Sequence, residues 1–150
     1  MRAVIQRVSF ASVKVDDEII CQIGPGLLIL LGIEDADDGN DVAWLAKKIT
    51  SLRIFSDSEG KMNLDLKETN GGLLVVSQFT LHASTKKGTR PSFIKAAKPD
   101  KAFPLYESFI YECESLTNRK VETGMFGATM DVELLNDGPI TINIDTKNKE

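Results

Sequence analysis

The stretch "LLVVSQFTLHAS", residues 73–84, changes character halfway along its length. Residues 73–76 form an unbroken apolar run that is typical of a buried strand. Ser77, Gln78 and Thr80 then follow with no turn residue between. A buried polar side chain without a partner costs about 1–3 kcal/mol. The strand end is therefore either a network whose hydroxyls bond back to the backbone, or the wall of a site.

A second unbroken apolar run lies earlier in the chain. Residues 27–33, "LLILLGI", follow a Gly-Pro-Gly breaker and are typical of a strand buried on both faces. Alternating apolar residues predict a further strand at residues 2–8, and shorter strand patterns follow at 13–15 and 19–23. These patterns predict a sheet in which the strand at residues 27–33 is buried on both faces.

Two helices are predicted from apolar residues that recur at helical spacing. The first helix presents one apolar face made of Val42, Leu45, Ile49 and Leu52. The second begins at residue 99 or 100, and its apolar face contains Phe103, Tyr106, Phe109, Ile110, Cys113 and Leu116. About seven or eight strands with two helices predict a single layered α/β domain. We expect it to span residues 1–150, with a polar tail at 145–150 that frays.

The segment "NDGP", residues 136–139, separates two alternating apolar runs. Residues 130–134 precede it, and residues 140–144 follow it. A short turn containing glycine between two such runs is typical of a β-hairpin. We therefore expect the two runs to face each other across a tight turn.

The composition is that of an ordinary globular protein. The 150 residues are 42% hydrophobic and 27% charged, with a net charge of −4, which argues against a general nucleic-acid-binding protein. A basic stretch nevertheless runs from residue 84 to residue 101, and it is either a solvated face or a contact for an anionic partner. Its cations are Lys86, Lys87, Arg90, Lys95, Lys98 and Lys101.

Several features indicate the cellular compartment. The longest strongly apolar stretch, residues 27–31, is too short to cross a bilayer. Cys21 and Cys113 stand far apart in apolar sequence, as reduced buried thiols do. The first residues lead directly into strand-like sequence without a signal-peptide pattern. We therefore expect a cytoplasmic protein with no membrane segment.

The residue inventory narrows the chemistry. His82 is the only histidine, so the sequence predicts no metal site. No Walker A or GxGxxG sequence is present, so no nucleotide cofactor is predicted. A catalytic triad would have to combine His82 with Ser77 or Thr80, and strand alternation would place His82 on the same face as Thr80. The alternative is a histidine that only packs.

Two motifs carry a resemblance to a known family. "VSQFTL" at residues 76–81 and "NDGPIT" at residues 136–141 resemble the signature motifs of the D-aminoacyl-tRNA deacylase family. The segments "MRAVIQRVSFASVKV", "IGPGLLILLGI", "LRIFSDSEGKMN", "KKGTRPSF" and "TGMFGATMDVELL" resemble the same family in the same order. The resemblance therefore covers nearly the whole chain. The chain departs from the family pattern at His82, where an aromatic or small residue is common, and at Ser84, where an acid is.

The resemblance implies a carboxylic ester hydrolase that releases a D-amino acid from the 3′ end of tRNA. It also implies a three-layer α/β/β fold with mixed, barrel-like sheets and two main helices. The protein would be a homodimer with its sites at the subunit interface and would use no cofactor. Ser77, Gln78, Phe79 and Thr80 would line the pocket of their own subunit. Gly138-Pro139, joined by a cis peptide and supported by Arg7, would enter from the partner.

The chemistry of an aminoacyl ester sets the predicted roles. Its carbonyl is already electrophilic, so a modest catalyst is sufficient. A single well-placed oxyanion donor raises the rate by about 10²–10³. We predict that the backbone N–H groups of Phe79 and Thr80 are the donors and that the terminal 2′-hydroxyl of the tRNA helps to activate water. The alternative has Thr80 as the nucleophile, although the sequence offers it no evident base.

Selection and binding complete the set of predictions. A rigid wall at Gly138-Pro139 would exclude an L side chain but not glycine, so glycyl-tRNA should also be cleaved. Met125 and Phe126 are predicted beside the substrate, Phe126 either as packing or against the terminal adenine. Lys86, Lys87 and Arg90 are predicted to contact tRNA phosphates. Two competing functions stay open: a non-catalytic dimeric RNA-binding module, and an esterase for another acyl-RNA or small ester.

Overall fold

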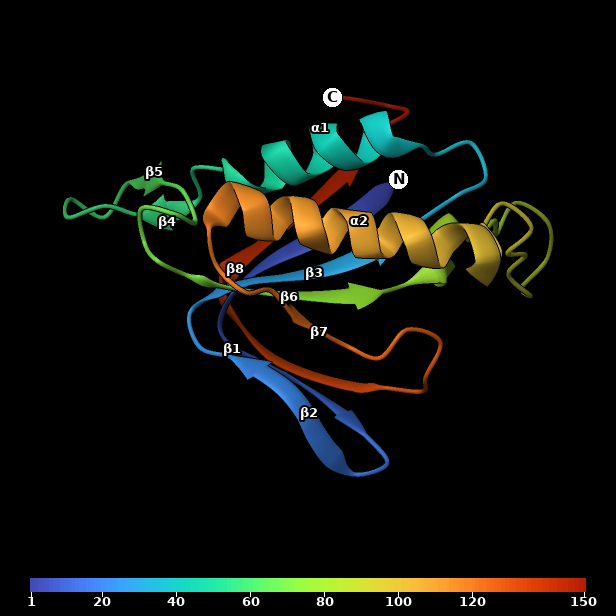
Figure 1. Cartoon of the computed structure of the whole chain (residues 1–150), viewed down its shortest axis with the longest axis horizontal. Coiled ribbons are helices and arrows are strands. Elements are labelled where there is room, and N and C mark those ends of the chain that lie inside the picture. Colours follow the sequence, from blue (N-terminus) through green and yellow to red (C-terminus); the bar gives the residue numbers. More distant parts are fainter.

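A mixed sheet of six strands runs through the middle of the molecule, and two helices cover one of its faces (Figure 1). The computed structural model describes residues 1–150. Its elements are β1 (Arg2–Val15), β2 (Glu18–Ile23), β3 (Gly26–Gly32), α1 (Gly39–Thr50), β4 (Phe55–Ser56), β5 (Met62–Leu64), β6 (Gly72–Ser77), the 3-10 helix η1 (Phe79–His82), α2 (Pro99–Thr117), β7 (Glu122–Thr123) and β8 (Asp131–Asp145). The strand order is β2-β1-β3-β6-β7, and β8 pairs with β1.

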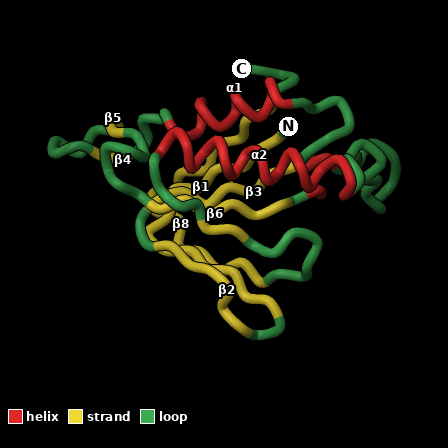
Figure 2. Tube along the Cα trace, in the orientation of Figure 1, coloured by secondary structure: helices red, strands yellow, loops and turns green.

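The central strands β3 and β6 are both buried on two faces, which the sequence predicted for β3, whereas for β6 it predicted only a buried strand. Alternate residues of β6, Leu73 and Val75, join a core cluster beneath α1 and α2, whereas Leu74 and Val76 join a second cluster. β3 and β6 are parallel, which fits strands that are covered on both sides. Figure 2 shows the helices gathered on one side and the curled outer strands on the other. The predicted α/β/β fold with mixed, barrel-like sheets and two main helices is confirmed.

The predicted hairpin at residues 136–139 is wrong. β8 is one continuous strand, and both of its halves pair antiparallel with β1. Gln6 pairs with Thr141 and Val8 with Asn136, so the four residues 137–140 bulge outward opposite Arg7. The two apolar runs do not pair with each other because β1, which is also continuous through residues 2–15, is long enough to satisfy both.

The strand β6 ends at Ser77, whereas the sequence led us to expect a strand that continues past Thr80. Gln78 N–H donates to the Leu31 carbonyl at 2.8 Å, and no strand neighbour continues beyond this bond because β3 ends at Gly32. The chain turns instead into η1, so the strand alternation that we expected for Thr80 and His82 does not apply. Short strands that were not predicted also form at β5 and β7.

The two ends of the chain lie side by side. The Met1 carbonyl accepts from Thr146 N–H at 2.9 Å, and the Met1 amine lies 2.5 Å from Asp37 Oδ1 with both groups fully buried. Lys147, inside the tail that we expected to fray, donates to Asp41 Oδ2 at 2.7 Å. Neither helix of the structure is long and apolar enough to cross a membrane.

Candidate functional site

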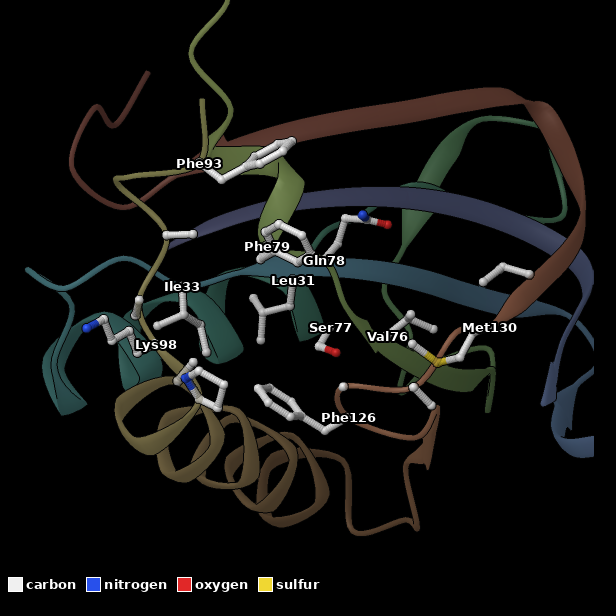
Figure 3. Close-up of a pocket in the computed structure, with 17 residues that line it drawn as sticks. Leu31, Ile33, Val76, Ser77, Gln78, Phe79, Phe93, Lys98, Phe126 and Met130 are labelled. Atoms are coloured by element: carbon white, nitrogen blue, oxygen red, sulfur yellow. The ribbon is translucent and has the colours of Figure 1, made fainter. Parts of the chain in front are cut away.

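A cavity of about 550 Å³ opens where β6 ends (Figure 3). The ends of β3 and β6 form its floor, and η1 forms one side. The chain leading into α2 and the segment before β8 complete the wall. Twelve of the seventeen lining residues are hydrophobic. Such an apolar hollow with a few polar groups is the usual form of a small-ligand site.

The polar strand end meets this cavity. Ser77, Gln78 and Phe79 line it, as the sequence predicted, whereas Thr80 does not contribute to the lining. Gln78 Nε2 donates to Thr80 Oγ1 at 2.5 Å. Because an amide is not a base, this bond orients the Thr80 hydroxyl but does not activate it as a nucleophile.

Two backbone donors at this point have no partner. Phe79 and Thr80 begin η1, and the first N–H groups of a helical turn have no partner within the turn. Leu81 is the first residue of the turn whose N–H donates backward, to the Gln78 carbonyl at 3.3 Å. No backbone or side-chain acceptor lies within hydrogen-bonding distance of the Phe79 and Thr80 N–H groups. Two free donors on adjacent residues can together hold one carbonyl oxygen.

His82 is not part of a catalytic triad. The side chain is 1% exposed, and neither ring nitrogen has a hydrogen-bond partner. Its nearest charged group is Glu34, whose Oε2 lies 3.9 Å from His82 Nδ1. Since His82 bonds to neither Ser77 nor Thr80, the packing alternative holds for this residue.

Aromatic side chains form much of the cavity wall. Phe79 and Phe93 meet edge to face with ring centroids 5.1 Å apart. Phe126 lines the cavity as predicted and packs on Phe103 and Tyr106 at 5.1 and 5.4 Å. The predicted neighbour Met125 is half exposed and does not line the cavity.

Several wall residues escaped the sequence prediction. They include Ile33, Phe93, Lys98 and Met130. Phe93 and Lys98 belong to the chain between η1 and α2, where the sequence showed only loop and charge patterns. No local signal marks such residues, because tertiary packing alone brings them to the end of β6.

The Gly138-Pro139 loop lies away from this cavity. Both residues are exposed, their peptide bond is cis, and neither lines the cavity of its own chain. Gly138 has φ +152°, and a Cβ there would lie 2.7 Å from the Ile140 nitrogen, so only glycine fits. The Asn136 side chain closes the bulge: it accepts from Ile140 N–H at 2.7 Å and donates to the Ile140 carbonyl at 3.1 Å.

Arg7 supports this loop from inside the protein. Its Nε donates to the Asp137 carbonyl at 2.8 Å, and its Nη1 donates to the Ile54 carbonyl at 2.7 Å. The Asp137 carboxylate lies 3.4 Å from the same Nε. The side chain therefore ties the bulge of β8 to the segment that follows α1.

The predicted phosphate contacts lie on a loop beside the cavity. Lys86, Lys87 and Arg90 are exposed, and none lines the cavity. Reciprocal backbone bonds between Ser84 and Ser92, at 2.8 and 2.9 Å, close the base of this loop. The next residue is Phe93, so the basic loop starts at the cavity rim.

Two buried titratable groups of α2, Tyr106 and Cys113, are structural. Burial raises the pKa of Tyr106, whose hydroxyl donates to the Val75 carbonyl at 3.0 Å. Burial, followed by the neighbouring Glu112 and Glu114, raises the pKa of Cys113 to about 12. No three His, Cys, Asp or Glu side chains come together in a way that would hold a metal ion. The arrangement therefore offers hydrogen-bond donors and shape rather than an acid–base pair.

Comparisons with known proteins agree on one family. The family model described as D-Tyr-tRNA(Tyr) deacylase matches residues 4–145. Proteins named D-aminoacyl-tRNA deacylase from Cytophaga hutchinsonii and Flavobacterium psychrophilum are 63% and 59% identical over 150 residues, the full length of both chains in each case.

Two solved structures share the fold. One, titled c-Myc DNA Unwinding Element Binding Protein, superposes with a TM-score of 0.91 at 38% identity over 97% of this chain and 99% of that chain. The other, titled a probable eukaryotic D-amino acid tRNA deacylase, has a TM-score of 0.80 at 17% identity, covering 95% of this chain and 98% of that chain. The second likeness concerns the fold alone.

Proposed function

The chain belongs to the D-Tyr-tRNA(Tyr) deacylase family, and on this premise we propose that it hydrolyses the ester bond of D-aminoacyl-tRNA to free D-amino acid and tRNA. The observation that carries the proposal is the pair of unpartnered N–H groups at Phe79 and Thr80, beside an apolar cavity. The tetrahedral intermediate of ester hydrolysis carries its negative charge on the former carbonyl oxygen. Two fixed donors stabilise that charge more than the neutral carbonyl, which lowers the barrier.

The water nucleophile needs little help from the protein. The Thr80 hydroxyl is bonded by Gln78 and not by a base, and His82 is turned into the core. We therefore assign Thr80 to positioning, and the terminal 2′-hydroxyl of the tRNA to activation of water. An unactivated hydroxyl is a weak nucleophile at neutral pH.

Each site is completed by a second copy of the chain. The Gly138-Pro139 loop projects from β8, is exposed, and does not line the cavity of its own subunit. Beside it lies an exposed apolar cross-strand pair, Phe10 and Leu135, which are 37% and 62% exposed. Exposed apolar side chains next to a projecting loop are suited to a protein interface. In the homodimer the loop of one subunit would reach the cavity of the other.

The loop accounts for selection between enantiomers. D and L residues held by the same ammonium and carbonyl differ only in the positions of hydrogen and side chain. Backbone held rigid by Arg7 and Asn136 would occupy the place of an L side chain and exclude it. Glycine has no side chain to exclude, so glycyl-tRNA would be cleaved as well.

The basic loop would bind the acceptor end of the tRNA. Lys86, Lys87 and Arg90 are exposed beside the cavity rim, where the phosphates that precede the terminal nucleotide of the tRNA would pass. Contacts of this kind position RNA without reading its sequence. They also explain how a chain with a net charge of −4 can bind RNA locally.

The first test compares D-tyrosyl-tRNA with a simple D-tyrosine ester. The proposal expects rapid hydrolysis of the RNA-linked ester and little hydrolysis of the small one. Equal rates would favour a general esterase, and binding of tRNA without hydrolysis would favour a non-catalytic RNA-binding module.

The second test examines the shared sites. A variant that lacks Gly138 and Pro139 is mixed with a Phe79→Pro variant, which lacks one N–H donor. If subunits exchange, the mixed dimer contains one complete site, so activity should return although each parent is impaired. A monomer in sedimentation, or no recovery after proven exchange, would contradict interface sites.

A further inference from the structure

The turn that carries the two free donors rests on a glycine of β3. A Cβ added at Gly32 would lie 3.0 Å from three separate atoms of this turn: the Gln78 carbonyl oxygen, Leu81 Cβ and His82 Cδ2. A methyl group there would force these neighbours to move by a few tenths of an ångström. η1 therefore lies directly on the backbone of the sheet, at the last residue of β3.

An arginine of the neighbouring strand holds the far end of the same turn. Arg2 is the paired residue of Gly32 in the β1–β3 ladder, and its Nη1 donates to the Leu81 carbonyl at 3.0 Å. The Arg2 Nε donates to Asp145 Oδ2 at 3.0 Å, which fixes the guanidinium between η1 and the end of β8. The side chain is 40% exposed, and with Leu81 it lines a separate hollow rather than the cavity.

A single 3-10 turn needs such support. Its i to i+3 bonds have poor geometry, and runs of this length are held mainly by their surroundings. Its last carbonyls have no partner within the turn and carry partial negative charge. A charged donor at Leu81 satisfies one of these carbonyls, and hydrogen bonds to charged groups contribute more than neutral ones.

We infer that Arg2 is a positioning residue, which together with Gly32 sets the orientation of η1 and thereby aims the Phe79 and Thr80 N–H groups at the substrate carbonyl. This inference rests on the proposed function for its catalytic part. Arg2 does not line the cavity. Its effect would therefore fall on the rate of the chemical step and not on binding, since the substrate contacts are unchanged.

The test compares Arg2→Gln, Arg2→Lys and Gly32→Ala with a matched control, Arg119→Gln. Arg119 also holds a turn through backbone carbonyls, donating to Gly71 at 2.7 Å, but that turn lies outside the cavity lining. Kinetics on D-tyrosyl-tRNA separate kcat from KM. Amide hydrogen exchange is measured at Leu81 and Ala83, whose N–H groups close the η1 turn on the Gln78 and Thr80 carbonyls. The thermal midpoint is measured on the same samples.

The inference expects Arg2→Gln to lower kcat by about tenfold or more, because small misplacements of catalytic groups cost this much. KM should stay within about twofold. Exchange within η1 should accelerate, Gly32→Ala should act in the same direction, and Arg2→Lys should recover part of the loss. Arg119→Gln should leave both kcat and η1 exchange unchanged.

Unchanged kcat and η1 exchange in Arg2→Gln would overturn the inference. So would an equal loss in Arg119→Gln that follows the thermal midpoint, because the effect would then be general destabilisation. If wild-type protein does not hydrolyse D-tyrosyl-tRNA at all, the proposed function fails. The exchange measurement still decides whether Arg2 holds the turn.

Discussion

Arg7 lies opposite the one large break in the β1–β8 ladder, and its Nε donates to the carbonyl of Asp137 at 2.8 Å. The same guanidinium donates from Nη1 to the Ile54 carbonyl, so one 9%-exposed side chain joins the projecting loop to the body of the protein. A loop in which four residues stand opposite one would otherwise have only the Asn136 side chain to close it. Arg7 therefore restrains the position of the Gly138-Pro139 backbone relative to the rest of the subunit.

Replacing Arg7 by Lys should loosen this loop. An ammonium carries the charge but lacks the planar fork that reaches two carbonyls. The loss of a buried donor should lower the free energy of unfolding by about 1–3 kcal/mol. Discrimination between D- and L-tyrosyl-tRNA should also fall, which parallel deacylation assays would measure. Arg119→Lys is the control, because Arg119 donates to the Gly71 carbonyl of a different turn. Full selectivity in Arg7→Lys would show that the loop does not need this support.

Replacing Thr80 by Val should weaken hydrolysis without abolishing it. The hydroxyl accepts from Gln78 and has no base beside it, so its removal costs orientation and not a nucleophile. We expect a loss of about tenfold, against at least about 10³-fold for a missing nucleophile. Rapid quenching of wild-type reactions should yield no acyl-enzyme. A trapped Thr80 ester, together with an inactive Thr80→Val variant, would contradict this assignment.

Reversing charge on the basic loop should weaken tRNA binding. Lys86→Glu with Lys87→Glu places acids where phosphates are expected, and each lost phosphate contact should reduce the slope of log K against log salt by about 1. Lys61→Glu with Lys67→Glu is the matched control, since these lysines are also exposed and lie on the two loops that flank β5. The measurement is a salt titration of tRNA affinity. Equal slopes in both double variants would place the RNA elsewhere.

Stability should fall at acid pH through Asp41. Burial acts to raise the pKa of Asp41, but hydrogen bonds from Lys147, Thr146 and the Asp38 backbone outweigh it and lower the pKa to about 2. Because this folded-state pKa lies below the ordinary value of 3.8, the stabilisation is complete above 3.8 and is lost as the pH falls toward 2. Urea unfolding should therefore show Asp41→Asn less stable than wild type at about pH 6, with the gap closing by about pH 2. A gap that is independent of pH would contradict the assignment.

Local sequence was enough to predict the elements that are marked by a buried apolar run or by the regular spacing of apolar residues. The apolar runs of β3 and β6 and the spacing of Val42 to Ile49 each identify their elements without tertiary information. The residues 136–139 look like a hairpin turn locally. Only the length of β1, which pairs with both halves of β8, turns them into a bulge.

The sequence predicted part of the candidate site in the same way. Ser77, Gln78 and Phe79 line the cavity. They could be predicted because polar residues directly after an apolar strand are unusual and visible in the sequence. Phe93 and Met130 also line it, yet an aromatic residue in a loop and a methionine before a strand have many other uses. Lys98 was assigned only to a charge run for the same reason.

The most direct test of the account is the rate of hydrolysis of D-tyrosyl-, L-tyrosyl- and glycyl-tRNA by the wild-type protein, measured side by side. We predict rapid release of D-tyrosine, measurable release of glycine, and release of L-tyrosine at the rate seen without enzyme. Release of L-tyrosine as fast as D-tyrosine would contradict the account, because a backbone wall at Gly138-Pro139 could then not be the basis of selection.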